Sequence, residues 1–188
     1  MPALYNRFSM KKIFLWGVGI VLFLGILFLR FWKVHAPDPY VISINGPKTD
    51  QVTEVDLEYC ADGDTVYFRK GDEILKVRFQ GIDAPEVAHE GSEDEPFALE
   101  AKERACSLVK NADHIYLETD PGHLYDRYGR ILAWVFADKE LVQERLVYEG
   151  YAEVKYLEDH ALYRDELTAA QNDAKRNGRG IWKTGENE

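Results

Sequence analysis

Three short stretches of the sequence combine carboxylates with arginines or with a tight turn. They are Asp62-Gly63-Asp64-Thr65, the run from Arg78 through Asp83 to Glu86, and Asp126-Arg127-Tyr128-Gly129-Arg130. Each stretch alone is also typical of a turn with solvated charges, because Asp and Gly are common turn residues. Together they offer carboxylate oxygens, which suit a hard cation such as Ca²⁺ or Mg²⁺. They also offer planar guanidinium groups, which suit a phosphate.

Acids for a metal and arginines for an anion are what hydrolysis of a phosphodiester requires. The reaction concentrates negative charge on the oxygens of a pentavalent phosphorus, and fixed cations stabilise that charge. It also needs a base or an orienting group for the attacking water. The combination of the three stretches therefore favours a single site over three unrelated turns.

Five runs predict the strands that carry these stretches, the first three of them by alternating apolar and polar residues. They are VTEVDLEYC, DTVYFRK, EILKVRFQ, HIYLET and RILAWVFA. Three segments predict helices: PFALEAKERACSLVKN, KELVQERLVYEG and DHALYRDELTAAQNDAKRNG. Pro96 is expected in the first turn of the first helix, Gly150 at the end of the second, and Asp159 as the N-cap of the third. The order indicates an α+β fold, a five-stranded OB-type β-barrel with three helices. The acidic stretch 86–95 is predicted to be a mobile loop.

Residues 13–29 carry no charged side chain and predict a single N-terminal transmembrane helix. Seventeen residues of helix span roughly 26 Å, near the lower limit for a bilayer, and Phe31 and Trp32 extend the span to 13–32. A cleaved signal peptide is the alternative, with Val34-His35-Ala36 as its best cleavage site, but Pro37 follows directly. An uncleaved anchor in the lipid bilayer is the favoured interpretation.

The distribution of basic residues around this span favours an extracytoplasmic domain. Three basic residues precede the span and two follow it, which places the N-terminus inside under the positive-inside rule. The predicted organisation is a basic flank (1–12), the anchor (13–32), a proline-containing tether (33–50), one folded domain (51–184) and a short tail (185–188).

The charge of the folded part argues against a nucleic-acid partner. Of the 23 Lys and Arg in the chain, five precede Pro37, which leaves 18 against all 33 Asp and Glu, a balance of −15. Affinity for phosphate comes largely from Lys and Arg. This acidic balance is the strongest evidence in the sequence against a nucleic-acid-binding function.

The two cysteines, Cys60 and Cys106, have no metal-ligand spacing, and the five histidines are scattered, so a zinc site is not expected. The favoured interpretation of the cysteines is two unpaired, partly buried thiols. A disulfide remains the alternative if the domain is extracytoplasmic.

From about Val52 to Trp182 the chain resembles the staphylococcal nuclease-like, or thermonuclease, family. The resemblance rests on separate motifs in the family's order: DGDT (62–65), RFQGIDAPE (78–86), PFALEA (96–101), DRYGR (126–130), YAEVKY (151–156) and IW (181–182). Several motifs in one order are far more specific than any one of them.

The resemblance implies a role for each matching residue. Asp64 and Asp83 correspond to carboxylate ligands of Ca²⁺, and Ala84 supplies a backbone carbonyl ligand. Glu86 corresponds to the acid that deprotonates or positions the attacking water. The remaining matches are Arg78 and Arg130 on the scissile phosphate, Arg127 and Tyr128 on phosphate and sugar, Tyr156 in the nucleotide pocket, and Asp62 and Thr65 in support of the turn.

The implied function is a membrane-anchored, Ca²⁺-dependent endonuclease in which water at the metal attacks phosphorus in DNA or RNA with little sequence specificity. Hard oxygen ligands do not separate Ca²⁺ from Mg²⁺ or Mn²⁺. A catalytically silent OB-type interaction module is the alternative, and no obligate protein partner is expected. The departures from the family pattern, which predict weak, salt-sensitive substrate binding, are Glu90, Glu93, Asp94 and Glu95 in the acidic loop, Leu124 and Glu158.

Overall fold

The computed structural model describes residues 44–88, 91, 93–122 and 124–183. The predicted flank 1–12, the anchor 13–32, most of the tether and the tail 185–188 lie outside these ranges. Within the described residues, no helix combines the length and the apolar composition that crossing a bilayer requires.

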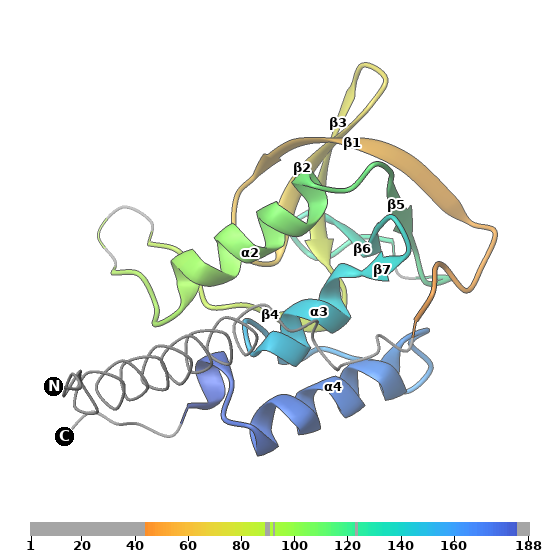
Figure 1. Cartoon of the computed structure of the whole chain (residues 1–188). Coiled ribbons are helices and arrows are strands. Elements are labelled where there is room, and N and C mark those ends of the chain that lie inside the picture. Colours follow the sequence, from red (N-terminus) through yellow and green to blue (C-terminus); the bar gives the residue numbers. More distant parts are fainter. Residues whose placement is uncertain (1–43, 89–90, 92, 123, 184–188) are drawn as a thin grey trace, which may run out of the picture. The chain divides into compact units, whose positions relative to one another are not determined.

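The five predicted strands form a closed barrel (Figure 1). They are β1 (Val52–Cys60), β2 (Thr65–Lys70), β3 (Glu73–Phe79), β5 (Ile115–Glu118) and β6 (Ile131–Ala137). Antiparallel pairing runs in the order β3-β2-β1-β5-β6, and a parallel pairing between β3 and β6 closes the ring. The α+β barrel with three helices that the sequence predicts is therefore present, and closure leaves the ends of β3 and β6 side by side.

Strand alternation separates the barrel core from its outer face. Val66 and Phe68 of β2 and Val77 and Phe79 of β3 are almost completely buried. Successive side chains of a strand point to opposite faces, so the residues between them point outward. In β6 all four residues from Ala133 to Phe136 are buried, because the face that does not line the barrel is covered as well.

Three helices pack around the barrel: α2 (Ala98–Lys110), α3 (Val142–Glu149) and α4 (Arg164–Arg176). Figure 1 shows α3 between the barrel and α4. As predicted, α3 ends at Gly150, which takes the left-handed conformation (φ 78°) that glycine adopts without strain.

The prediction that Asp159 caps the last helix is wrong. The helix begins at Arg164, after Tyr163, and Asp159 is 98% exposed and ion-paired with Arg164 at 3.2 Å. The physical reason is that Tyr163 is buried against Trp134 and hydrogen-bonds to Glu118, which fixes the chain in turns before the helix starts. The helical spacing of the sequence does not reveal these tertiary contacts of Tyr163.

Two short strands carry the site residues into place. β4 (Ile82–Asp83) pairs with β8 (Glu153–Val154), and the Lys155 amide donates to the Gly81 carbonyl at 3.0 Å. The pairing places the segment around Tyr156 beside the turn that follows β3. The remaining short elements are β7 (Glu140–Leu141) and a 3-10 turn, η1 (Gly180–Trp182).

The expectation of two free thiols is wrong, because Cys60 and Cys106 form a disulfide with a Cα–Cα distance of 5.8 Å. Cys60 ends β1 and Cys106 lies in α2, which packs on that end of the strand. Sequence spacing gives no sign of this contact, which exists only once the helix docks on the barrel. The bond ties α2 to the strand that leads into the Asp62–Thr65 turn.

We expect the disulfide to contribute about 4 kcal/mol to the free energy of unfolding, the loop-entropy value for its sequence separation of 46 residues. Guanidinium unfolding with and without a reductant measures this contribution. A Cys60→Ser, Cys106→Ser variant should match the reduced protein and should not respond to reductant. Equal midpoints for the oxidised and reduced protein would contradict the expectation.

Candidate active site

The turn between β1 and β2 is a compact, backbone-bonded structure. The amides of Ala61 and Asp62 both donate to the Thr65 carbonyl at 3.0 Å. Gly63 is required here for space: a Cβ at this position would lie 2.8 Å from the Cβ of Ala84 and 3.0 Å from that of Ala101. The turn is therefore clamped between α2 and the segment that follows β4, and it aims Asp64 inward.

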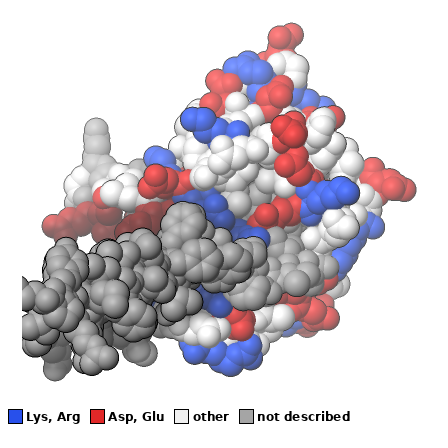
Figure 2. All heavy atoms as spheres, viewed as in Figure 1, with Lys and Arg blue, Asp and Glu red and all other residues white. Residues whose placement is uncertain are grey.

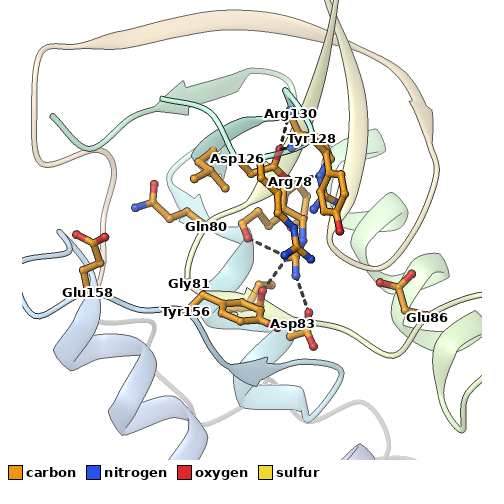
Figure 3. A pocket seen from close by; sticks show the side chains of 14 residues that line it. Arg78, Gln80, Gly81, Asp83, Glu86, Asp126, Tyr128, Arg130, Tyr156 and Glu158 are labelled. Atoms are coloured by element: carbon orange, nitrogen blue, oxygen red, sulfur yellow. Dashed lines mark hydrogen bonds and ion pairs between the residues drawn. The ribbon is translucent and has the colours of Figure 1, made fainter. Parts of the chain in front are cut away.

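A buried ion cluster forms around Arg78. Its Nη1 lies 2.9 Å from Asp64 Oδ2, and its Nη2 lies 2.6 Å from Asp83 Oδ1. Nη1 also donates to the carbonyls of Phe79, at 3.1 Å, and Ile82, at 2.7 Å. One guanidinium thus fixes two carboxylates and the backbone of the β3–β4 turn. Figure 3 shows its contacts with Asp83 and with that turn. Burial raises the pKa of Asp64, and the Arg78 charge opposes that rise.

Lys155 supplies a second cation to the same cluster. Its Nζ lies 2.8 Å from Asp83 Oδ2 and 3.2 Å from Glu153 Oε1. The pKa of Lys155 is raised, chiefly by the hydrogen bond to Asp83 and then by the one to Glu153. Both oxygens of Asp83 are consequently engaged by cations, one from Arg78 and one from Lys155.

Glu86 lies where the chain leaves the cluster, and its carboxyl group is paired with an acid. The pKa of Glu86 is raised to about 7, first by a hydrogen bond with Asp62, then by partial burial and by the charges of Asp62 and Asp64. The Glu86 amide donates to Glu95 Oε2 at 3.0 Å, and the Glu95 amide donates to the Glu86 carbonyl at 3.1 Å. The two ends of the predicted mobile loop are thereby held together.

Arg130 is oriented by Asp126, four residues earlier. Asp126 Oδ2 accepts from Arg130 Nε at 2.6 Å, and Oδ1 accepts from the amides of Tyr128 and Arg130 at 2.8 and 2.9 Å. Although burial raises the pKa of Asp126, these bonds outweigh it and leave the pKa below its ordinary value. Arg130 Nη1 also donates to Thr65 Oγ1 at 3.3 Å, and Thr65 in turn donates to Asp64 at 3.0 Å.

These groups meet in a pocket of about 550 Å³. Figure 3 shows Arg78 near its centre, with Asp83 and Tyr156 on one side and Tyr128 and Arg130 on the other. Tyr128 and Tyr156 are 68% and 76% exposed, so their rings are open to a ligand. The pocket is lined by Arg78, Phe79, Gln80, Gly81, Ile82, Asp83, Glu86, Asp126, Arg127, Tyr128, Arg130, Leu132, Tyr156 and Glu158.

Most residues that the sequence singles out come together here. Asp62, Asp64, Thr65 and Ala84 are buried behind the lining, with the Ala84 amide donating to Asp64 Oδ2 at 2.8 Å. Sequence reasoning assigned no role to Lys155, or to Asp126 as the group that orients Arg130. The DRYGR motif contains a signal for Asp126, since an acid four residues from an arginine can pair with it across a turn. The sequence contains no comparable signal for Lys155, because its contact with Asp83 depends on the pairing of two strands that are each two residues long.

The donor set fits a hard cation only in part. Among the described residues, no three acidic, histidine or cysteine side chains converge on one point as a cation site. However, the raised pKa values of Asp64 and Glu86 report an excess of partly desolvated carboxylates that a divalent cation would offset. Asp64 and Asp83, with the Ala84 carbonyl, could hold such an ion, with water and substrate as the remaining ligands.

Comparison with known proteins gives a family match that covers more than half of the chain. The model of the family "Staphylococcal nuclease homologue" matches residues 76–184. The chain is 35% identical over 133 residues to the SPbeta prophage-derived endonuclease YokF and, over the same length, to endonuclease YncB, both from Bacillus subtilis (strain 168). It is 29% identical over 174 residues to a thermonuclease from Staphylococcus hyicus.

The extents of these matches differ. The YokF and YncB matches each cover 70% of this chain, but only 45% and 63% of those two proteins. The thermonuclease match covers 92% of this chain and 99% of that protein. The chain therefore spans less than two thirds of the length of the two endonucleases that it matches.

Proposed function

The chain belongs to the staphylococcal nuclease homologue family, and from that premise we propose that it is a metal-dependent endonuclease that hydrolyses phosphodiester bonds in DNA and RNA. One observation supports the proposal most. A single pocket is lined by Arg78 and Asp83, by a titratable acid, Glu86, and by a second oriented arginine, Arg130, and Asp64 is ion-paired with Arg78 behind the lining. A binding module has no need for so costly a concentration of charge.

The side chains divide the work of phosphoryl hydrolysis among them. Arg130, held rigid by Asp126, offers its Nη groups to the oxygens of the phosphate. The Nη2 group of Arg78 also lies in this pocket, where it donates one hydrogen bond to Asp83. Fixed donors that meet the growing charge of the transition state lower the barrier without reorganising. Glu86, whose pKa of about 7 lies near neutral pH, accepts the proton of the attacking water or orients that water.

Ca²⁺ is the proposed cofactor, with Mg²⁺ and Mn²⁺ as alternatives of the same ligand preference. Asp64, Asp83 and the Ala84 carbonyl are the residues that would hold it. When bound, the ion supplies positive charge to the phosphate and lowers the pKa of a water beside it.

The acidic surface affects substrate binding rather than chemistry. Figure 2 shows acidic side chains spread among basic ones over the described part of the surface in view. Glu158 lines the pocket itself. We expect an enzyme with few phosphate contacts, whose affinity for a polymer depends on the local pocket and its aromatic rings.

A catalytically silent module draws support from Lys155. Its ammonium group sits on Asp83, a proposed metal ligand, and so neutralises the cluster without any ion. Under the nuclease proposal, Lys155→Met frees Asp83 Oδ2 and should tighten Ca²⁺ binding about 1.5-fold to fivefold, the range of a partly exposed ion pair.

Calorimetric titration with Ca²⁺ measures this change, with Lys139→Met, in the β6–β7 turn, as the control for net charge. Unchanged or weaker binding by Lys155→Met would favour the silent module.

The raised pKa of Glu86 gives a prediction on pH. In the metal-free protein, Glu86 is protonated below about pH 7 and becomes a carboxylate, able to accept a proton, as the pH rises through that value. Asp62→Asn keeps the shape and the carbonyl oxygen that accepts from the Gly63 amide, but it removes the main cause of the shift. The pKa of Glu86 should then fall toward its ordinary value of 4.5.

Carboxyl NMR titration of the metal-free protein reads this pKa directly. Glu95→Gln is the matched control, because Glu95 bonds the Glu86 amide and not its carboxyl group. A Glu86 midpoint near 4.5 in the unsubstituted protein would refute the effect of Asp62 on Glu86.

The proposed location of the domain is extracytoplasmic, tethered to a bilayer through residues 13–32. The disulfide between Cys60 and Cys106 supports the location, because such bonds persist in oxidising compartments. The anchor itself rests on the sequence alone.

The proposal is tested by incubating the 188-residue chain with single-stranded DNA, duplex DNA and RNA of unrelated sequences, with added Ca²⁺, Mg²⁺ or Mn²⁺. Cleavage of both polymers without a sequence preference is the expected result. Absence of cleavage under every condition, from protein with a cooperative unfolding transition, would reject it.

A further inference from the structure

The outer face of the barrel carries a row of side chains that the proposed chemistry does not use. Tyr59 of β1 is the register partner of Tyr67 of β2, and Tyr67 is the partner of Lys76 of β3. The three residues therefore lie side by side across three adjacent strands. The two tyrosine rings stack with centroids 4.2 Å apart and planes 15° from parallel, and Lys76 Nζ lies 5.5 Å from the centre of the Tyr67 ring.

Two members of this row are open to solvent, and the middle one, Tyr67, is half-buried. Tyr59 is 50% exposed, and Lys76 is also exposed. The neighbouring inward residues of the same strands, such as Val66 and Val77, already fill the barrel core. A stacked aromatic pair beside a lysine is the combination that holds unpaired bases and their phosphates in proteins that bind single-stranded nucleic acid.

The row is continuous with the candidate active site. Thr65 pairs with Arg78 in the same β2–β3 ladder, two residues along from the Tyr67–Lys76 pair and on the same face. Two residues of strand advance about 7 Å, comparable to one nucleotide step of an extended strand. The charge of Arg130 reaches Tyr67 as well: the pKa of Tyr67 is lowered, first by a hydrogen bond with Tyr59, then by Lys76 and Arg130.

A second hollow connects the site pocket to Lys76 of the row. It is lined by Lys76, Val87, Glu93 and Glu95 together with Glu86, Tyr128 and Arg130, and the last three also line the site pocket. A strand whose phosphate lies at Arg130 can leave the pocket along this hollow toward Lys76. The acidic side chains that line this hollow repel phosphates. The strand is therefore expected to contact Lys76 and the tyrosine rings rather than the rest of the hollow.

We propose that Tyr59, Tyr67 and Lys76 form an extension of the substrate site that stacks an unpaired base of a single-stranded nucleic acid and contacts its phosphate, next to the nucleotide held in the active-site pocket. The inference rests on the proposed nuclease function for its substrate class. It adds a preference for single-stranded over duplex substrate, because a paired base cannot stack on the rings. In this proposal, part of the affinity for a polymer comes from aromatic stacking. Stacking does not require positive charge, so an acidic domain can use it.

The test compares a twelve-nucleotide single strand with a dinucleotide, which fills only the pocket. Tyr59→Ala, Tyr67→Ala should raise KM for the longer substrate roughly tenfold at unchanged kcat, and should leave dinucleotide cleavage unaltered. The Tyr59→Phe, Tyr67→Phe variant keeps the rings and should stay near the unsubstituted protein. Tyr116→Ala is the matched control, because Tyr116 lies on β5 and does not line the site pocket.

Fluorescence anisotropy of a labelled twelve-nucleotide strand, in the presence of a chelator, measures binding without cleavage. The alanine variant should bind about tenfold more weakly, and Lys76→Ala should reduce the salt dependence of binding by about one phosphate contact. Equal affinity of all variants would overturn the extension, as would an equal loss on both substrates. If the protein binds the strand through this row but cleaves nothing, the extension stands and the nuclease proposal fails.

Discussion

Arg78→Ala should lower kcat for single-stranded DNA by about 10³-fold and the free energy of unfolding by about 3–5 kcal/mol. Both effects have one origin. Arg78 is 9% exposed and joins Asp64 to Asp83, so its loss leaves two carboxylates close together without the cation that holds them. The breaking of a buried ion pair is costly because the remaining charge stays desolvated. The same loss removes a donor from the phosphate site.

Arg78→Lys separates the charge from the geometry. A lysine keeps the positive charge but cannot contact two carboxylates and two carbonyls from one planar group. It should regain much of the stability and little of kcat. Arg104→Ala is the control, because it removes an arginine that pairs with both oxygens of Glu149 between α2 and α3, outside the pocket. We expect it to cost about 1 kcal/mol and to leave kcat unchanged.

Guanidinium unfolding and steady-state kinetics, on all three variants, decide the matter. A folded Arg78→Ala variant with normal kcat would show that the cluster is structural only.

Arg130→Ala should also lower kcat by about 10²- to 10³-fold, but with a small cost in stability. Arg130 lies at the edge of the pocket, and Asp126 keeps the amide hydrogen bonds from Tyr128 and from residue 130 when the side chain is removed. The loss should therefore appear in the transition state rather than in the fold. Kinetics at saturating substrate, with a thermal melt of the same preparation, measure both quantities.

Arg127→Ala is the matched comparison for this prediction. Arg127 is three residues away and also lines the pocket, but its guanidinium lies over the Tyr128 ring, 4.7 Å from the centre, and is not held by Asp126. A residue that contacts substrate without meeting transition-state charge should change KM and leave kcat nearly intact. If Arg127→Ala and Arg130→Ala behaved alike, the oriented arginine would have no special role.

The barrel was predictable in part because β2 and β3 alternate between residues that line the barrel and residues that point away from it. Phe68 and Phe79 fall on the inner face by simple counting, and Arg78 falls on the outer face, where it is buried in its ion cluster. The turn residues Gly63 and Gly129 mark where the site motifs sit. Closure of five such strands brings the ends of β3 and β6 together, so the approach of Arg78 to the DRYGR motif follows from the fold.

The features that escaped prediction depend on contacts between distant, short elements. The Cys60–Cys106 bond requires α2 to dock on the end of β1, and the Lys155–Asp83 contact requires β4 to pair with β8. Neither strand of that pair is longer than two residues, so no periodic pattern announces it. The partnership of Glu86 with Asp62 is of the same kind, since the two acids come from different turns and attract notice only by their altered pKa.

The most direct measurement is cleavage of single-stranded DNA by the 188-residue chain beside its Glu86→Ser, Arg130→Ala variant, each with Ca²⁺ and with a chelator. The account predicts cleavage by the unsubstituted protein with Ca²⁺, none with chelator, and none by the variant, which should still fold and bind Ca²⁺. A folded, Ca²⁺-binding protein that cleaves nothing, or a variant that cleaves as fast as the unsubstituted protein, would contradict it.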